Sequence, residues 1–179
     1  MSIVVGIDIG GSTTKIVGLS KNEIVSPMLV KANDPVASIY GAFGKFLSGN
    51  QLHLGDIKQI MVTGVGSSHI TQPLYGIPTG KVDEFHAIGK GGLFLTDLNR
   101  AIVVSMGTGT AFIIADSNGE KHIGGTGIGG GTLLGLSNKM LNIRHFEDLI
   151  EMAQGGSLSN VDLNISDITR DTLETLPPD

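Results

Sequence analysis

Two short turns rich in glycine and hydroxyl residues carry the clearest chemical signal in this sequence. The first is GGST at residues 10–13, two positions before Lys15, and the second is MGTGT at residues 106–110. Glycine allows a ligand to approach main-chain amides closely, and hydroxyl and ammonium groups add donors that suit phosphate. A pair of such turns predicts a two-sided clamp on the phosphates of a nucleotide.

An acidic residue, Asp8, precedes the first turn. A carboxylate beside phosphates commonly holds Mg²⁺, directly or through water, so Asp8 is the candidate metal ligand. The alternative is a glycine hairpin without a ligand, which the presence of the second turn disfavours. Because Gly10 and Gly11 are expected between two strands, a dinucleotide fingerprint is disfavoured, and the GxxxxGK[ST] pattern of a Walker loop is absent.

Two neighbouring acids, Asp83 and Glu84, stand at an expected helix start. Transfer of a phosphoryl group to an alcohol needs a carboxylate that orients the hydroxyl group and accepts its proton. The structural alternative is that Asp83 is the N-cap of the helix and Glu84 a first-turn acid favoured by the helix dipole. Spacing alone leaves both interpretations open.

A further glycine cluster, GGTGIGGG at residues 124–131, precedes an expected helix at 132–141. Crowded glycines at a helix N-terminus allow a nucleotide to approach the main chain, and the alternative is a flexible connection. The five histidines show no metal-binding spacing, so His69, His86 and His145 are interpreted as surface or packing residues.

The elements that must position these residues follow from hydrophobic periodicity and breaker residues. They alternate between strands and helices, which predicts an α/β fold. The expected strands are residues 3–9, 15–19, 23–30, 57–63, 101–105 and 111–115, the first three forming a meander. The expected helices are residues 35–48 after Asp34, 83 to about 96, 132–141 and 146–153.

Composition excludes several classes of protein. Hydrophobic residues make up 40% of the chain and charged residues 16%, which excludes a disordered tail. A net charge of −5 without a basic stripe argues against a nucleic-acid partner. The absence of cysteine excludes disulfides and thiolate zinc sites. Because no apolar run approaches ~18 residues, no membrane span is expected, and the predicted location is the cytoplasm.

Four motifs occur in the order found in type II pantothenate kinases, and the chain resembles that family over essentially its whole length. They are GIDIGGSTTK at 6–15, VDEFHAIGKGG at 82–92, SMGTGTA at 105–111 and GGTGIGGGTLLGL at 124–136. The resemblance implies a ribonuclease H-like mixed sheet with flanking helices, of the actin/hexokinase type. Residues 1–179 would form the first lobe of a two-lobe kinase, carrying the phosphate loops and the catalytic acid.

The family continues past the proline-rich segment near Pro177 with a second lobe. The resemblance therefore implies either a truncated chain or one piece of a longer gene. Half of the cleft would be missing from the isolated chain, so we expect that chain to be weakly active or inactive.

The reaction implied by the resemblance is ATP-dependent phosphorylation of pantothenate to 4'-phosphopantothenate, the first step toward coenzyme A, with ATP and Mg²⁺ as cofactors. The acid of the DEF segment is the family's general base, which implies Glu84, and an aromatic residue stacks near adenine, which implies Phe146. His122 stands where the family usually has an arginine that helps hold pantothenate, and an imidazole cannot reproduce a guanidinium fork. The implied nucleotide-binding residues are Gly10, Gly11, Ser12, Thr13, Thr14, Lys15, Thr108, Gly109, Gly130, Gly131 and Thr132.

Two other functions remain open alongside the kinase. One is an ATPase activator of a 2-hydroxyacyl-CoA dehydratase, which has a similar opening motif but holds an iron–sulfur cluster with cysteines that this chain lacks. The other is a non-catalytic regulatory module that binds a nucleotide or coenzyme A. The sequence leaves the oligomeric state open, with a homodimer as one alternative.

Overall fold

The computed structural model describes residues 2–11, 13–31 and 34–168. The chain divides into two compact units, one containing residues 1–105 and 111–124 and the other containing residues 106–110 and 125–179. Among the described residues, no helix has the length and apolar character needed to cross a membrane.

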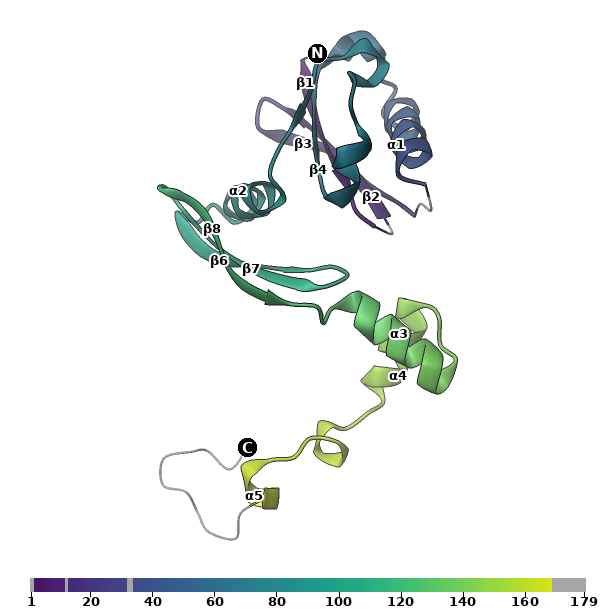
Figure 1. Ribbon diagram of the computed structural model, residues 1–179, viewed down its shortest axis with the longest axis vertical. Coiled ribbons are helices and arrows are strands. Elements are labelled where there is room, and N and C mark those ends of the chain that lie inside the picture. The colour runs from purple at the N-terminus through teal and green to yellow at the C-terminus, as the bar shows by residue number, and fades with distance from the viewer. Residues whose placement is uncertain (1, 12, 32–33, 169–179) are drawn as a thin grey trace. The chain divides into compact units, whose positions relative to one another are not determined.

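The first unit begins with a mixed five-stranded sheet in the order β3-β2-β1-β4-β5 (Figure 1). Strands β1 to β3 form an antiparallel meander, and β4 and β5 add to the other edge in parallel. The meander confirms the arrangement predicted from the sequence. The strands are β1 (Ile3–Ile9), β2 (Thr13–Ser20), β3 (Glu23–Lys31), β4 (Ile57–Thr63) and β5 (Thr79–Lys81).

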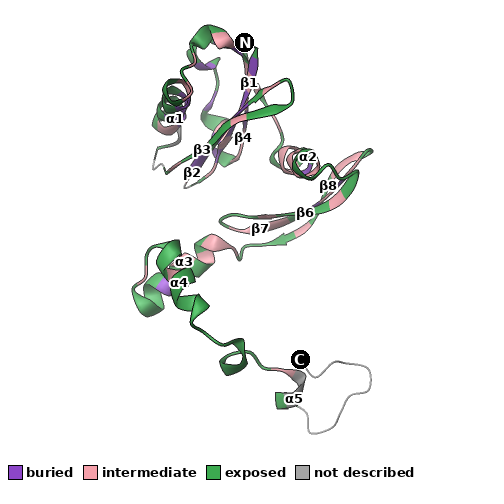
Figure 2. Ribbon diagram, turned by 180° about the vertical axis from the view of Figure 1, so that it is seen from behind, coloured by how far each residue is buried: buried purple, intermediate pink, exposed green. Residues whose placement is uncertain are grey.

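Helix α1 (Pro35–Gly49) covers one face of this sheet. It begins where the sequence predicts, because the Asp34 carboxylate accepts a hydrogen bond from the Ala37 amide at 2.9 Å. Phe43 and Phe46 face the sheet and are fully buried. They pack with alternate residues of β1 and β4 in a single apolar core, seen as the buried region in Figure 2.

The first unit also contains a three-stranded sheet in the order β6-β7-β8, formed by β6 (Arg100–Met106), β7 (Thr110–Asp116) and β8 (Gly119–Thr126). Their short connections allow only antiparallel pairing. Helix α2 (Glu84–Thr96) lies against one face of this sheet (Figure 1). On the other face Ile102, Val104 and Met106 are exposed, which gives β6 a two-residue alternation.

In the described residues of the second unit, helices follow the turn at 106–110 and the end of β8, and loops connect them. The unit contains α3 (Gly130–Leu141), α4 (Phe146–Gln154) and the short α5 (Ile165–Ile168). Helices α3 and α4 pack together. The Ser137 hydroxyl donates to the carbonyl of Ile143, which fixes the link between these helices.

Three expected boundaries differ from the structure. The TGK segment at 79–81, which is absent from the predicted strands, is strand β5. The glycine cluster at 124–131 begins inside a strand, because β8 extends to Thr126, and this strand was missing from the predicted elements. Helix α3 begins at Gly130 instead of residue 132, which places the last two glycines in its first turn. Glycine weakens both strand and helix patterns, so periodicity could not locate these ends.

Candidate functional site

The first predicted phosphate turn connects β1 to β2. The Gly10 amide donates to the carbonyl of Thr13 at 2.9 Å, which closes the turn, and Gly11 is exposed. Ser12 lies outside the described residues. The Thr14 side chain is fully buried on the core side of β2, so its hydroxyl group does not face a ligand outside the sheet.

Beside this turn, Asp8 and Lys15 are direct partners across β1 and β2. The Lys15 ammonium donates to Asp8 Oδ2 at 2.7 Å, and the two side chains are 54% and 30% exposed. Because both remain accessible, an approaching phosphate could bind the ammonium group while the carboxylate turns toward a cation. The pair thus places one cationic and one anionic group at the end of a glycine turn.

The segment that follows β4 packs against the Asp8 side chain. Gly64 has a φ of 84°, and a side chain on it would overlap with Asp8 Oδ1 and the Ile9 carbonyl. Thr63 pairs with Asp8 in register, and its hydroxyl is buried without a hydrogen-bond partner among the described residues. The sequence predicts the strand at 57–63 that ends before Gly64, but not the contact of Gly64 with the site. The TGVG pattern was the available signal.

These groups fit Mg²⁺. Hard oxygen ligands, few protein carboxylates and several water or phosphate oxygens are typical of magnesium bound with a nucleotide. Asp8 provides the carboxylate and Thr63 a nearby hydroxyl that lacks a partner. In the part of the chain that the structure describes, no group of three or more His, Asp or Glu residues could hold a metal unaided. A cation held by Asp8 would take further oxygen ligands from water or from a bound ligand.

A hollow of about 380 Å³ opens on the same strands. The Asp8–Lys15 pair lies in its wall, and the rest of the wall is mostly apolar. This combination can accept a small ligand that has an apolar body and a charged end. The lining residues are Gly6, Asp8, Lys15, Ile16, Val17, Pro27, Met28 and Leu29.

The second predicted turn lies against the start of α3. The amide of Gly130 donates to the Gly107 carbonyl at 2.8 Å. A side chain on Gly129 would lie 2.7 Å from the carbonyl oxygens of Gly107 and Thr108, so only glycine permits this contact. Part of the glycine cluster is thus required for packing, which excludes the flexible-connection alternative at this point.

The residues of this unit that were predicted to bind a nucleotide differ in exposure and in whether their side chains already form hydrogen bonds. Thr108 and Gly109 lie at the turn, with Thr108 exposed, and Gly131 stands in the first turn of α3. The Thr132 hydroxyl donates to the Gly127 carbonyl and accepts from the Gly129 amide, so it already caps the helix. Phe146, the first residue of α4, is 44% exposed and available for stacking.

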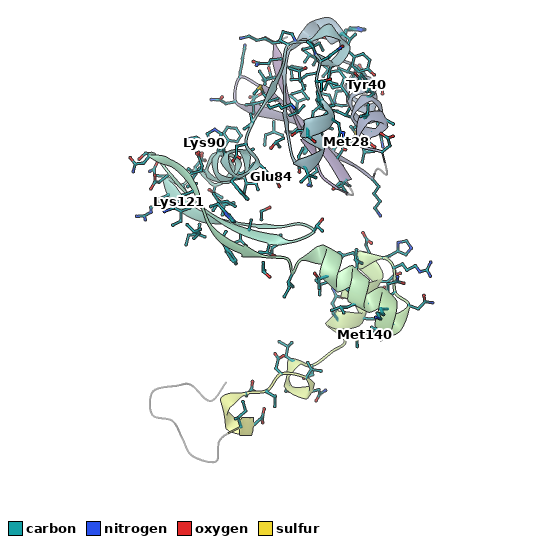
Figure 3. The ribbon with its side chains drawn as sticks, in the orientation of Figure 1. Met28, Tyr40, Glu84, Lys90, Lys121 and Met140 are labelled. Carbon is teal, nitrogen blue, oxygen red and sulfur yellow. The ribbon has the colours of Figure 1, made fainter. Side chains whose placement is uncertain are left out.

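The two acids at the start of α2 have different roles in the structure. The Asp83 carboxylate accepts a hydrogen bond from the His86 amide at 3.1 Å, which confirms it as the N-cap. Glu84, labelled in Figure 3, is exposed, and among the described residues no hydrogen bond or ion pair involves its side chain. Of the two, Glu84 is the carboxylate available to a ligand.

His122, the predicted substrate-binding residue, lies flat on an aromatic ring. Its imidazole stacks on Phe85 with ring centroids 4.2 Å apart and an angle of 5° between the planes. Sequence reasoning did not anticipate this contact, because the two residues belong to different elements, β8 and α2. The stack brings His122 to the helix that carries Glu84.

The predicted site residues thus form three local groups. Asp8, Lys15 and the first turn belong to one, Glu84 and His122 to the second, and the turn at 106–110 with α3 to the third. The clamp between the two turns and the nucleotide and substrate roles of these residues stay predictions.

Comparison with known sequences shows relatives over nearly the whole chain. A family model described as Fumble matches residues 98–177. A type II pantothenate kinase of Bacillus cereus (strain ATCC 14579) is 33% identical, and the match covers 94% of this chain and 60% of that protein. One of Staphylococcus aureus (strain USA300) is 32% identical, covering 98% and 63% respectively. This chain therefore spans about 60% of the length of these relatives.

Two solved structures share the fold. The activator of the 2-hydroxyisocaproyl-CoA dehydratase from Clostridium difficile with bound ADPNP matches with a TM-score of 0.69 at 18% identity, covering 92% of this chain and 60% of the activator. The ethanolamine utilization protein EutJ from Carboxydothermus hydrogenoformans matches with a TM-score of 0.58 at 18% identity, covering 84% and 60%. At these identities the likeness shows fold alone, and it confirms the actin/hexokinase-like class expected from the sequence.

Proposed function

We propose that the chain is part of a type II pantothenate kinase, because it is 32–33% identical to two such kinases over 94–98% of its length. In this proposal it carries the phosphate turns and the catalytic acid for ATP-dependent phosphorylation of pantothenate. The product would be 4'-phosphopantothenate, which places the reaction at the start of coenzyme A synthesis. ATP is the proposed phosphoryl donor, pantothenate the acceptor, and the cytoplasm the proposed location.

The availability of Glu84 carries this proposal. Transfer to an alcohol requires a carboxylate that accepts the hydroxyl proton as the new bond to phosphorus forms. Glu84 is exposed and unpaired within the described chain, whereas its neighbour Asp83 is occupied as a helix cap. Glu84 is therefore the proposed general base, and it takes the proton from the pantothenate hydroxyl during transfer.

The other residues bind and orient. Main-chain amides near Gly10 and the Lys15 ammonium are proposed to bind the ATP phosphates, together with Thr108 and the first turn of α3. Asp8 would hold Mg²⁺, which neutralises phosphate charge when bound. Phe146 is the proposed stacking partner of adenine. The whole chain would form one lobe of the kinase.

The substrate contact differs from that implied by the family. His122 is the proposed pantothenate contact, and its stacking on Phe85 leaves the edge of the imidazole to donate or accept a hydrogen bond. A single ring nitrogen binds a carboxylate less firmly than a guanidinium fork. We therefore expect His122→Arg to lower the KM for pantothenate.

The test is pantothenate-dependent ATP turnover by the complete product of the gene that contains this chain. Glu84→Gln should lower kcat by roughly 100-fold or more, because the proton acceptor is lost, while the KM for ATP stays unchanged. Glu23→Gln, the same change at an exposed position of β3, is the matched control and should behave as the unsubstituted protein. Turnover by Glu84→Gln equal to that of the control would remove Glu84 as the base.

A second candidate function is a regulatory module that binds a nucleotide or coenzyme A without catalysis. The observation that favours it is His122 at the position of the family's substrate arginine. Calorimetry on the same protein separates the two. Binding of a nucleotide or coenzyme A without any pantothenate-dependent turnover would favour the regulatory module.

A further inference from the structure

A buried carboxylate that the proposed reaction does not use lies between α2 and β8. The side chain of Glu120 is only 5% exposed. Its two oxygens contact nitrogen atoms of α2, with His86 Nδ1 at 2.6 Å from Oε2 and the Lys90 ammonium Nζ at 3.2 Å from Oε1. Figure 3 labels Lys90 on the helix, and Figure 1 shows the helix beside the strand.

The contacts that Glu120 and His122 of β8 make with α2 form one contact region, called the Glu120 joint. His86 and Lys90 are one helical turn apart, so they share a face of α2. Glu120 and His122 are two positions apart on β8, so they share a face of the strand. The ion pairs at Glu120 and the ring stack at His122 therefore hold the first two turns of the helix on the same strand.

Gly89 allows this close contact. A side chain there would lie 2.5 Å from Glu120 Cγ and 3.2 Å from the Ala115 methyl group. The helix backbone thus rests directly on the carbon chain of Glu120. Any larger residue would move the helix away from the strand and stretch both ion pairs.

Packing alone does not explain a glutamate at this position. Burial of a carboxylate is costly, and a buried ion pair commonly adds less stability than apolar residues of similar volume. The two carboxylate oxygens lie close to nitrogen atoms from successive turns of α2, although Oε1 has no hydrogen-bond partner among the described residues. Rotation or sliding of α2 would separate the carboxylate from these nitrogen atoms and leave it buried without a partner, which is costly.

We propose that Glu120 is a positioning residue that locks the first turn of α2, and with it Glu84, onto the strand that carries His122. The inference rests on the proposed function, in which Glu84 is the base and His122 contacts the substrate. Glu120 touches neither substrate nor reacting atoms. It fixes the spacing of the two groups that do.

The first experiment measures this spacing without reference to activity. Residues 1–179 contain no cysteine, so Leu95→Cys on α2 and Lys121→Cys on β8, both exposed, introduce two spin-label sites there, with any cysteine elsewhere in the complete protein replaced by serine. Electron-spin distance measurements should give one narrow distribution in the complete protein. Adding Glu120→Gln should broaden or shift that distribution, whereas adding Glu23→Gln should leave it unchanged. An unchanged distribution with Glu120→Gln would overturn the proposal.

The second experiment measures the catalytic consequence. Misplacement of a catalytic group by about 1 Å can lower turnover by roughly 100-fold, so Glu120→Gln should lower kcat by about 10- to 100-fold with little change in the KM for ATP. Gly89→Ala retains every charge but displaces the helix, and it should lower kcat in the same way. Normal kcat in both folded variants would contradict a positioning role.

Lys90→Gln, which removes a single partner at the surface, tests the same joint if Glu120→Gln fails to fold. It should give a smaller fall in kcat and a measurable broadening of the spin-label distances. Wild-type values for both quantities would count against the proposal. If no protein, substituted or not, phosphorylates pantothenate while the distances respond as expected, then the proposed function fails and the Glu120 joint is supported.

Discussion

Asp8 is held from two sides at the end of β1. Lys15 pairs with one carboxylate oxygen, and Gly64 lies against the other. A cation can replace the Lys15 ammonium as the partner of Asp8. No other residue can replace Gly64, because its φ of 84° and the absence of a side chain are both needed. The orientation of Asp8 therefore depends on a residue far from it in the sequence.

Gly64→Ala should destabilise the protein by about 2–5 kcal/mol, from a left-handed backbone that alanine disfavours and from overlap with Asp8. Urea unfolding followed by circular dichroism measures this. Gly44→Ala is the control, since it lies on the exposed side of α1 with no atoms in the way, and it should stabilise by about 0.5–1 kcal/mol. Equal midpoints for the two variants would contradict this account of Gly64.

At the scale of elements, the two adjacent acids at the start of α2, Asp83 and Glu84, have different structural roles. The N-cap needs a side-chain oxygen that accepts from the third amide of the helix, and Asp83 provides it. The next position points its side chain outward, so Glu84 is left without a partner in the described chain. The same local geometry that caps the helix exposes the proposed base.

Substitutions at Asp83 distinguish capping from catalysis. Asparagine caps as well as aspartate, so Asp83→Asn should retain both stability and pantothenate-dependent turnover, whereas Asp83→Ala should cost about 1 kcal/mol of stability. Thermal unfolding and the coupled turnover assay on the complete protein measure these effects. A loss of turnover in Asp83→Asn as large as in Glu84→Gln would show that the assignment of the base to Glu84 is wrong.

Sequence analysis predicted elements well where their signals were local. The alternating apolar residues of β1, the Asp34 cap of α1 and the apolar run of β4 each specify their own conformation, and the structure confirms all three. It missed β5 and β8, which are short or rich in glycine and polar residues. These two segments adopt a strand conformation because they pair with a neighbouring strand. The hydrophobic pattern of the segment itself does not indicate such pairing.

At the scale of the whole molecule, buried apolar residues are concentrated in the sheet β1 to β5 and α1. Figure 2 shows mostly exposed and half-buried residues in β6 to β8 and in the helices that follow. In the sheet of β6 to β8, much of the fixed geometry comes from polar contacts such as those of Glu120. Stability should therefore respond to pH.

Glu120 gives the direction of that response. Burial raises the pKa of its carboxyl group, while hydrogen bonds from Lys90 and His86 lower it, and the net pKa lies below the ordinary value of 4.5. A carboxyl group with a lowered pKa stabilises the fold above its unfolded pKa, and this contribution is lost as pH falls through the folded pKa.

Thermal unfolding of the complete protein should therefore show a gap between the unsubstituted protein and Glu120→Gln at pH 7 that narrows below about pH 4.5. Glu23→Gln serves as the control, because its carboxylate is exposed on β3. A gap that persists unchanged in acid would mean that the ionised carboxylate is not the stabilising form.

The sequence by itself determined the meander of β1 to β3, the caps of α1 and α2, and the glycine turns beside Asp8 and Thr108, because each depends on residues that are neighbours along the chain. Only the tertiary structure decided that Gly64 supports Asp8, that His122 stacks on Phe85 and that Glu120 lies beneath α2. Those contacts join residues from separate elements. Their partners are chosen by how strands and helices pack, which local sequence patterns do not specify.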